Sequence, residues 1–169
     1  KLEYVNTDKI GMWGHSLGGF LTLRSMVISN HIKAGVIWGG VVGSYQEMYE
    51  DWWSKRRFPS PTSAQINPTN RPSRQAFIAK YGQPTEDNEF WNAISSTTYI
   101  NDVSGPIQLH HGLSDETVPD TLSKRLYERM ANAGKEVEYF EYPGNDHNLS
   151  QSFSLAMDRT VEFFDKYLK

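Results

Sequence analysis

A serine near the start of this sequence lies in a setting that acyl-transfer chemistry requires. Residues 14–18 read Gly-His-Ser-Leu-Gly, which fits the G-x-S-x-G pattern, and a further glycine follows. In this pattern the serine occupies a strained turn between a strand and a helix, so that its hydroxyl is exposed. We therefore predict Ser16 as a nucleophile and the backbone N–H of Leu17, at the helix N-terminus, as an oxyanion donor. The alternative is a glycine-rich turn whose serine caps the helix.

The glycines of this pattern have separate expected tasks. Gly14 and Gly18 flank the turn, where we expect no room for a side chain. Gly19 is expected to let the helix approach the sheet closely.

A serine hydroxyl is a weak nucleophile, so the pattern also requires a general base. Of the five histidines, His147 lies in a polar loop between an apolar run and the final helical stripe. Loops at the carboxyl ends of parallel strands are where such sites collect, which predicts His147 as the base. A solvated or helix-capping histidine is the alternative. For His110 and His111 we expect a buried packing role, with a place lining the site as the alternative.

The third member of a triad orients the imidazole and stabilises its protonated form. Asp115 follows the third apolar run, and the order Ser16, Asp115, His147 is the chain order of α/β-hydrolases. Capping of the next helix is the alternative role for Asp115. Glu116 would suit if the loop register shifted by one, and Asp146 adjoins the histidine but is badly placed to reach its ring. The competing acids are Glu116, Asp120 and Asp146.

Three further side chains are candidates for contacting substrate. They are His15, Trp38 (which precedes Gly39) and Tyr45. No metal or other cofactor is expected, because the chain has no cysteine and no H-E-x-x-H pattern. His110 and His111 are adjacent rather than spaced on one face, which also disfavours a metal site.

The elements that must position these residues alternate between strand and helix. Such alternation predicts an α/β fold, here a partial α/β-hydrolase with a parallel sheet of about four strands flanked by helices. Apolar runs predict the strands at residues 9–14, 34–40, 106–112 and 137–143. Helical stripes cover residues 16–29, 118–130 and 153–168, and Gly134 is the expected end of the second.

One long segment, residues 45–105, interrupts this alternation. It holds five prolines and three tryptophans, and it separates the second and third predicted strands. Short helices are plausible at 73–80 and 86–93. Because connections of this length are either functional or loosely ordered, we weigh a lid or pocket wall against a surface excursion.

Bulk properties narrow the classes of function. The chain has 169 residues, enough for one domain, and a formal net charge of -3 with both signs scattered, so nucleic acid is an unexpected partner. No apolar run approaches the length of a membrane span. The first residue is Lys1 and no signal peptide is evident, so we expect a mature, trimmed or excised segment.

The motifs in order resemble the catalytic domain of the prolyl oligopeptidase family, which overlaps with related acyl esterases. The resemblance covers nearly the whole chain and implies Ser16, Asp115 and His147 as the triad. Family members have an eight-stranded sheet, and this chain is similar to the C-terminal half of it. The matching residues are 8–19, 91–95 with Tyr99-Ile100, His111-Gly112 with Asp115 and Val118-Pro119, and Tyr142-Pro143-Gly144 with His147.

The absent half would normally supply a second oxyanion donor and cover the open edge of the first strand. We therefore expect a homo-oligomer or association with a missing N-terminal segment. The leading hypothesis is a serine hydrolase that cleaves small carboxylic esters through an acyl-enzyme. The alternatives are a serine oligopeptidase or aminopeptidase acting on short peptides, and a catalytically idle fragment that needs its N-terminal half.

Overall fold

The computed structural model describes residues 3, 5–53 and 72–169 of the chain. The chain divides into two compact units. The first, which we call the sheet unit, comprises Lys1–Val42 and Tyr99–Lys169; the second, the excursion unit, comprises Gly43–Thr98.

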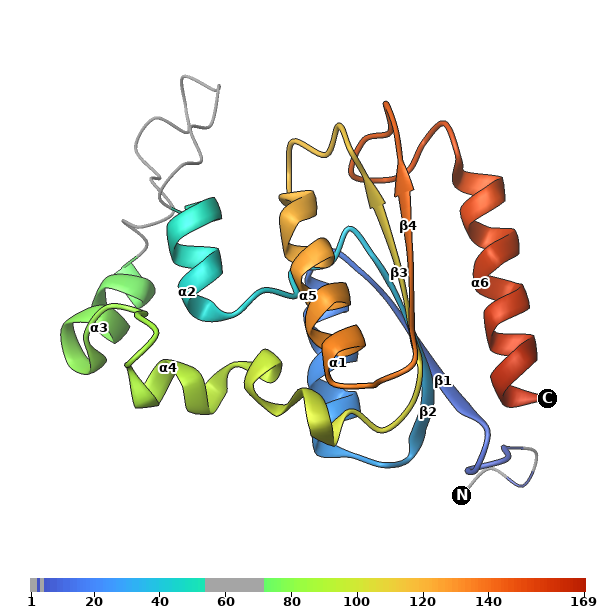
Figure 1. Cartoon of the computed structure of the whole chain (residues 1–169), viewed down its shortest axis with the longest axis horizontal. Helices are drawn as coiled ribbons and strands as arrows, with labels where there is room; N and C mark the ends of the chain where they lie inside the picture. The colour runs from blue at the N-terminus through green and yellow to red at the C-terminus, as the bar shows by residue number, and fades with distance from the viewer. Residues whose placement is uncertain (1–2, 4, 54–71) are drawn as a thin grey trace. The chain divides into compact units, whose positions relative to one another are not determined.

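The sheet unit is built on four parallel strands, which confirms the predicted α/β fold (Figure 1). The strands pair in the order β1-β2-β3-β4, which is also their order along the chain. Their register places His15 opposite Trp38 and Trp38 opposite His110, so the carboxyl ends of three strands lie level. The strands are β1 (Ile10–His15), β2 (Ile32–Trp38), β3 (Ile107–Gly112) and β4 (Val137–Tyr142).

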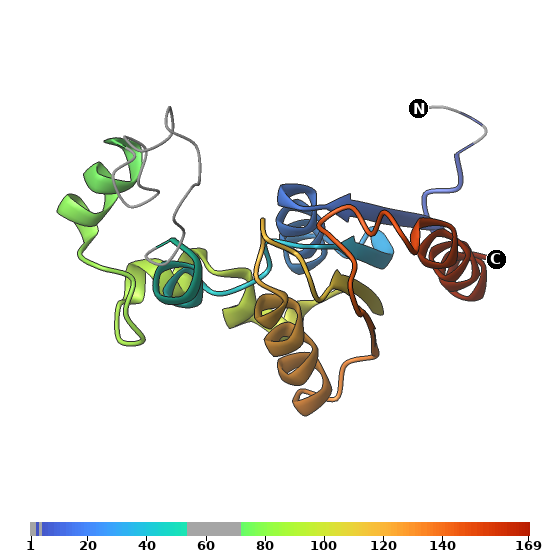
Figure 2. The same cartoon turned by 90° about the horizontal axis from the view of Figure 1, so that it is seen from above.

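Three helices sandwich this sheet. Helices α1 (Leu17–Ile28) and α5 (Asp120–Asn132) cover one face, and α6 (Phe153–Leu168) covers the other (Figures 1 and 2). Successive side chains of β2 lie on opposite faces of the sheet, as in any strand. Those on the α6 side join one apolar cluster: Ala34, Val36 and Trp38 with Tyr142, Leu149, Ala156 and Phe163.

The predicted helical stripe at 118–130 becomes the buried face of α5. Leu122, Leu126 and Met130 are fully buried. Burying a leucine or methionine side chain contributes about 1.5–3 kcal/mol to stability. Gly134 follows the helix with a φ of 68°, the left-handed conformation that commonly ends helices.

The excursion unit is helical, and two of its helices lie close to where the sequence predicts them. The second predicted helix begins at Glu89 rather than 86, because Asn88 caps it by accepting hydrogen bonds from the N–H groups of Phe90 and Trp91. Part of the predicted excursion, with Pro59, Pro61 and Pro68, lies outside the described residues. The elements are α2 (Tyr45–Glu47), η1 (Met48–Trp53), α3 (Pro72–Tyr81), α4 (Glu89–Ile94) and η3 (Ser96–Asp102), the last crossing the unit boundary.

Aromatic rings hold the excursion unit together. Tyr81 and Phe90 stack with ring centroids 3.6 Å apart, and the Arg74 guanidinium lies 3.8 Å from the centre of the Trp53 ring. Tyr45 packs against Trp53 and Trp91. The proposed role of this unit as a lid or pocket wall stays a prediction. Within the described part of the chain, no helix has the length and apolar character needed to cross a membrane.

Candidate active site

Ser16 occupies the turn between β1 and α1 in a strained backbone conformation. Its φ is 57° and its ψ is -118°, a region that residues with a side chain rarely adopt. Its N–H donates to the carbonyl of Trp38 at 2.9 Å, and its own carbonyl accepts from the N–H of Val41 at 3.1 Å. The side chain makes no capping hydrogen bond to α1. The backbone is thus fixed while the hydroxyl is not used as a helix cap, which weighs against the capping alternative.

The glycines around this turn differ in what they permit. A Cβ at position 14 would lie 2.2 Å from the carbonyl oxygen of Gly18, and one at position 19 would lie 2.6 Å from Ile37. Both positions therefore require glycine. The expectation for Gly18 is wrong, because a Cβ there meets nothing within 4 Å. The tight side of the turn is the one that faces β1, and position 18 points into open space.

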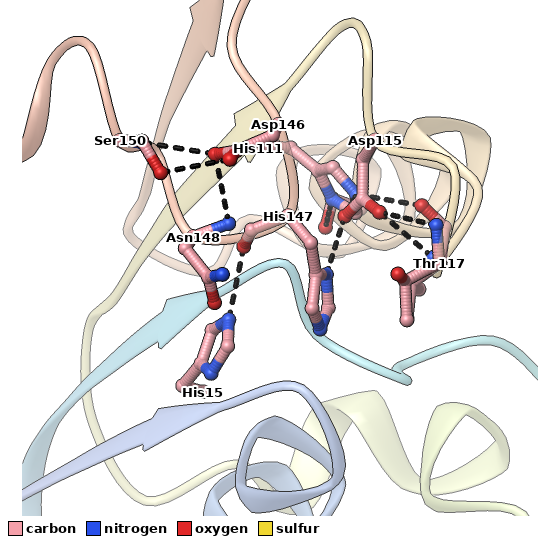
Figure 3. Close-up of polar contacts among 10 residues, drawn as sticks. His15, His111, Asp115, Thr117, Asp146, His147, Asn148 and Ser150 are labelled. Atoms are coloured by element: carbon pink, nitrogen blue, oxygen red, sulfur yellow. Dashed lines mark hydrogen bonds and ion pairs between the residues drawn. The ribbon is translucent and has the colours of Figure 1, made fainter.

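A short hydrogen bond joins His147 to Asp115 (Figure 3). The Nδ1 atom of His147 lies 2.7 Å from Oδ2 of Asp115. Asp146 takes no part, since its carboxylate binds the backbone of Asn148 and both the backbone and hydroxyl of Ser150 in its own loop. The Asp115 carboxylate is therefore the acid paired with the predicted base.

The Asp115 side chain is fully buried, and both its oxygens are engaged. Oδ1 accepts from the N–H groups of Thr117 at 2.7 Å and Val118 at 2.9 Å, while Oδ2 faces His111 Nε2 at 3.1 Å as well as His147. Burial alone would raise the pKa of Asp115, but the bonds from His111, His147, Val118 and Thr117 outweigh it and hold the pKa well below its ordinary value. The N-cap of α5 is Pro119, so Asp115 does not cap that helix.

The segment that leaves β2 brings the serine turn and the histidine loop together. Ser16 is hydrogen-bonded through its backbone to Trp38 and Val41, and Gly39 lies between them. A Cβ on Gly39 would lie 3.0 Å from Nδ1 of His147 and 3.3 Å from Oδ2 of Asp115. Gly39 has a φ of 49°, so only a glycine fits here both in conformation and in space. Position 39 therefore forms a wall of the site and offers no side chain to a substrate.

His15, a candidate for contacting substrate, contacts His147. Its Nε2 lies 2.9 Å from the backbone carbonyl of His147, and the two ring centroids are 4.5 Å apart. A carbonyl can only accept, so this nitrogen carries the hydrogen. The close approach of the histidine loop to β3 also needs Gly112, where a Cβ would lie 2.3 Å from the carbonyl oxygen of Asn145.

The sheet unit has an apolar cavity of about 350 Å³ at the carboxyl ends of β1 and β2. Two of the three candidates for substrate contact, His15 and Trp38, line it. Tyr45 belongs to the excursion unit, where it lines a separate cavity of about 210 Å³. The residues lining the first cavity are Trp13, His15, Trp38, Asn148, Ser150 and Phe153.

Two further features bear on the chemistry. Leu17 is the first residue of α1, so its N–H has no acceptor one turn earlier in the helix. Among the described residues, no group of three or more His, Asp or Glu side chains is arranged to hold a metal ion. The contact of His111 with Asp115 was not predicted from the sequence, although the position of His111 at the end of a strand, four residues before Asp115, was a usable signal.

The amino-acid sequence matches a known protein family. A family model described as "Prolyl oligopeptidase family" matches residues 1–169. The chain belongs to the prolyl oligopeptidase family. Among curated relatives, the uncharacterized peptidase YuxL of Bacillus subtilis is 23% identical over 149 residues, which cover 88% of this chain and 20% of YuxL.

Solved structures share the fold of this prolyl oligopeptidase-family chain. A puromycin-hydrolyzing peptidase of Mycobacterium tuberculosis superposes with a TM-score of 0.69 at 18% identity, over 97% of this chain and 22% of that one. An acylaminoacyl peptidase of Pyrococcus horikoshii superposes with a TM-score of 0.67 at 24% identity, over 98% and 25%. The chain thus spans about a fifth to a quarter of the length of these relatives.

Proposed function

We propose that this chain carries the serine-hydrolase centre of a peptidase, with Ser16 as nucleophile, His147 as general base and Asp115 as the acid that orients it. The observation that carries the proposal is the 2.7 Å bond from His147 Nδ1 to Asp115 Oδ2, adjoining a strained Ser16 turn in a G-x-S-x-G motif. A buried carboxylate that stays ionised holds the imidazole in the tautomer whose Nε2 has a free lone pair.

The reaction proceeds by acyl transfer in two steps. His147 Nε2 takes the hydroxyl proton of Ser16 as Oγ bonds to the substrate carbonyl carbon, and the imidazolium then gives that proton to the leaving amine. The resulting acyl-enzyme is cleaved by water, whose proton passes to His147 before returning to Ser16. Asp115 stabilises the imidazolium at each stage through the Nδ1–H hydrogen bond.

The N–H of Leu17 is the proposed oxyanion donor. It stands at the positive end of the α1 dipole, beside the serine that attacks. An oxyanion hole generally uses two donors, and loss of one costs on the order of 3 kcal/mol in transition-state stabilisation. A second donor from outside the described residues would therefore raise the rate substantially.

A peptide substrate is favoured over a carboxylic ester, which was the leading hypothesis from the sequence. The relatives named above are called peptidases, one of them a puromycin-hydrolyzing and another an acylaminoacyl peptidase. The test compares aminoacyl and dipeptidyl anilides with short-chain nitrophenyl esters, using Ser16→Ala as control. Anilide cleavage that disappears in Ser16→Ala supports the peptidase; ester cleavage alone would return the assignment to an esterase.

The outer edge of the sheet supports a proposal about partners. Among the described residues β1 pairs only with β2, and three nearby apolar side chains are about half exposed or more. Unpaired strand edges template further pairing, so we propose that a second copy or a further polypeptide segment covers this edge. A stable monomer in sedimentation at micromolar concentration would contradict self-association. These side chains are Trp13, Leu17 and Leu21.

A further inference from the structure

The second imidazole on Asp115 has a defined place in the site. His111 lies in β3, four residues before Asp115, and its Nε2 is 3.1 Å from the same Oδ2 atom that His147 contacts. The side chains of His111 and Asp115 are both fully buried. Figure 3 shows the two rings approaching the carboxylate from different elements.

The hydrogen bonds of His111 fix where its hydrogen lies. Nε2 faces two groups that can only accept, the Asp115 carboxylate and the carbonyl of Val118 at 3.1 Å. Nε2 therefore carries a hydrogen, and Nδ1 is hydrogen-bonded to the hydroxyl of Ser123, 2.7 Å away on α5. The ring is thus held in place by both β3 and α5, with its Nε2–H directed at the Asp115 carboxylate.

This arrangement leaves the carboxylate no freedom to turn. Two backbone N–H groups fix Oδ1, and two imidazoles fix Oδ2. Without His111, Oδ2 would keep one donor and a buried lone pair without a partner, which costs free energy in a dry site. A misplacement of about 1 Å in a catalytic group can lower the rate about 100-fold.

We propose that His111 is a positioning residue, which holds the Asp115 carboxylate in the orientation that aligns His147 with Ser16. This inference rests on the proposed function. The role is distinct from packing, because a ring that only filled space would not need a nitrogen directed at the acid.

The test uses His111→Phe, which keeps a buried ring and removes the donor, with His110→Phe as matched control. His110 is the neighbouring residue of β3 and equally buried, but its nitrogens bind Tyr142 and Gln108 rather than Asp115. We expect His111→Phe to lower kcat about 10- to 100-fold with little change in KM. The acid limb of the pH profile should move to higher pH, because Oδ2 then accepts from His147 alone. His110→Phe should leave both unchanged.

A spectroscopic measurement reports on the same contact without turnover. The hydrogen-bonded Nδ1 proton of His147 should give a downfield proton resonance that shifts in His111→Phe and stays in place in His110→Phe. In His111→Gln, the side-chain amide can donate in place of Nε2, so kcat should recover at least in part. If His111→Phe does not fold, Ser123→Ala serves instead, with a smaller loss in the same direction.

The outcomes separate the two proposals. The positioning role would be overturned if His111→Phe and His110→Phe had the same kcat, the same acid limb of the pH profile and the same resonance position. Absence of turnover in the wild-type protein would overturn the proposed function, and the resonance would then decide alone whether His111 positions Asp115.

Discussion

His110 and His111 are neighbours in β3 and equally buried, yet they serve opposite faces of the sheet. On the α5 face, His111 joins Ser123 to Asp115 and so reaches the proposed triad. On the α6 face, the ring of His110 takes part in a chain of hydrogen bonds in which no triad member appears. Two adjacent histidines of the same burial thus have different partners, and this difference separates the positioning role proposed for His111 from a role in stability alone.

The α6-face chain runs from a cation to an anion. Arg159 donates to the Tyr142 hydroxyl at 3.1 Å, and that hydroxyl donates to His110 Nδ1 at 2.7 Å. His110 Nε2 donates to Gln108 at 2.7 Å, and the Gln108 amide donates to Glu138 at 2.8 Å. Burial first, and then the charge of Arg159, lower the pKa of His110 to about 3. The ring is therefore neutral at every pH at which the protein would be assayed.

The largest expected contrast between the faces comes from removing one carboxylate charge on each. Asp115→Asn should lower kcat about 10⁴-fold, because the amide favours the wrong tautomer of His147. Glu138→Gln, the matched change on the α6 face, should leave kcat within about twofold, because Glu138 touches no triad residue. Steady-state kinetics on the two variants measures the contrast. A similar loss of kcat in both variants would contradict it.

The next contrast is in the pH dependence of stability. A buried histidine with a lowered pKa stays neutral in the folded protein and takes up a proton when the chain unfolds. The free energy of unfolding therefore has its full value above about pH 6.5 and falls as the pH decreases toward about 3. Between pH 7 and pH 5 the loss from His110 is about 2 kcal/mol. Asp115 adds to this slope only below its ordinary pKa of about 4, since its folded pKa is depressed.

Urea unfolding of the wild type and His110→Phe at both pH values measures this slope. The wild type should lose about 2 kcal/mol more than the variant between pH 7 and pH 5. Equal slopes would show that His110 is not the group responsible.

The smallest expected effect comes from one hydroxyl on the α6 face. Tyr142→Phe removes the donor to His110 Nδ1 and the acceptor for Arg159. Stability should fall by about 1 kcal/mol, near the lower end of the cost of leaving a buried polar atom without its partner. Thermal unfolding measures the loss, and kcat at a temperature well below the transition should stay unchanged. A large fall in kcat would mean that the α6 face also reaches the site.

The sequence predicts the strands, the main helices and the family, because apolar runs alternate with helical stripes and the motifs occur in a fixed order. It also pairs Asp115 with His147 correctly in space, because both residues follow the carboxyl ends of parallel strands. The catalytic roles of these residues remain a prediction. The second predicted strand begins two residues earlier than expected and ends at Trp38, because Gly39 turns the chain out with a positive φ.

Features that depend on tertiary packing could not be predicted from the sequence. The space beside Gly18 depends on where the end of β1 lies, and the motif alone does not reveal it. The different partners of His110 and His111 depend on which helix covers which face, since both residues look alike in the sequence. Tyr45 opens the predicted excursion and belongs to the excursion unit, as its position in the chain indicates, but the cavity that it lines there depends on packing.

The measurement that tests the central claim most directly is covalent labelling with a fluorophosphonate, followed by mass spectrometry of the peptides. The proposed triad predicts one adduct on Ser16 in the folded protein and none in Ser16→Ala, because only an activated serine hydroxyl displaces fluoride from the reagent. A folded wild-type protein that stays unlabelled, or one that is labelled at another residue, would contradict it.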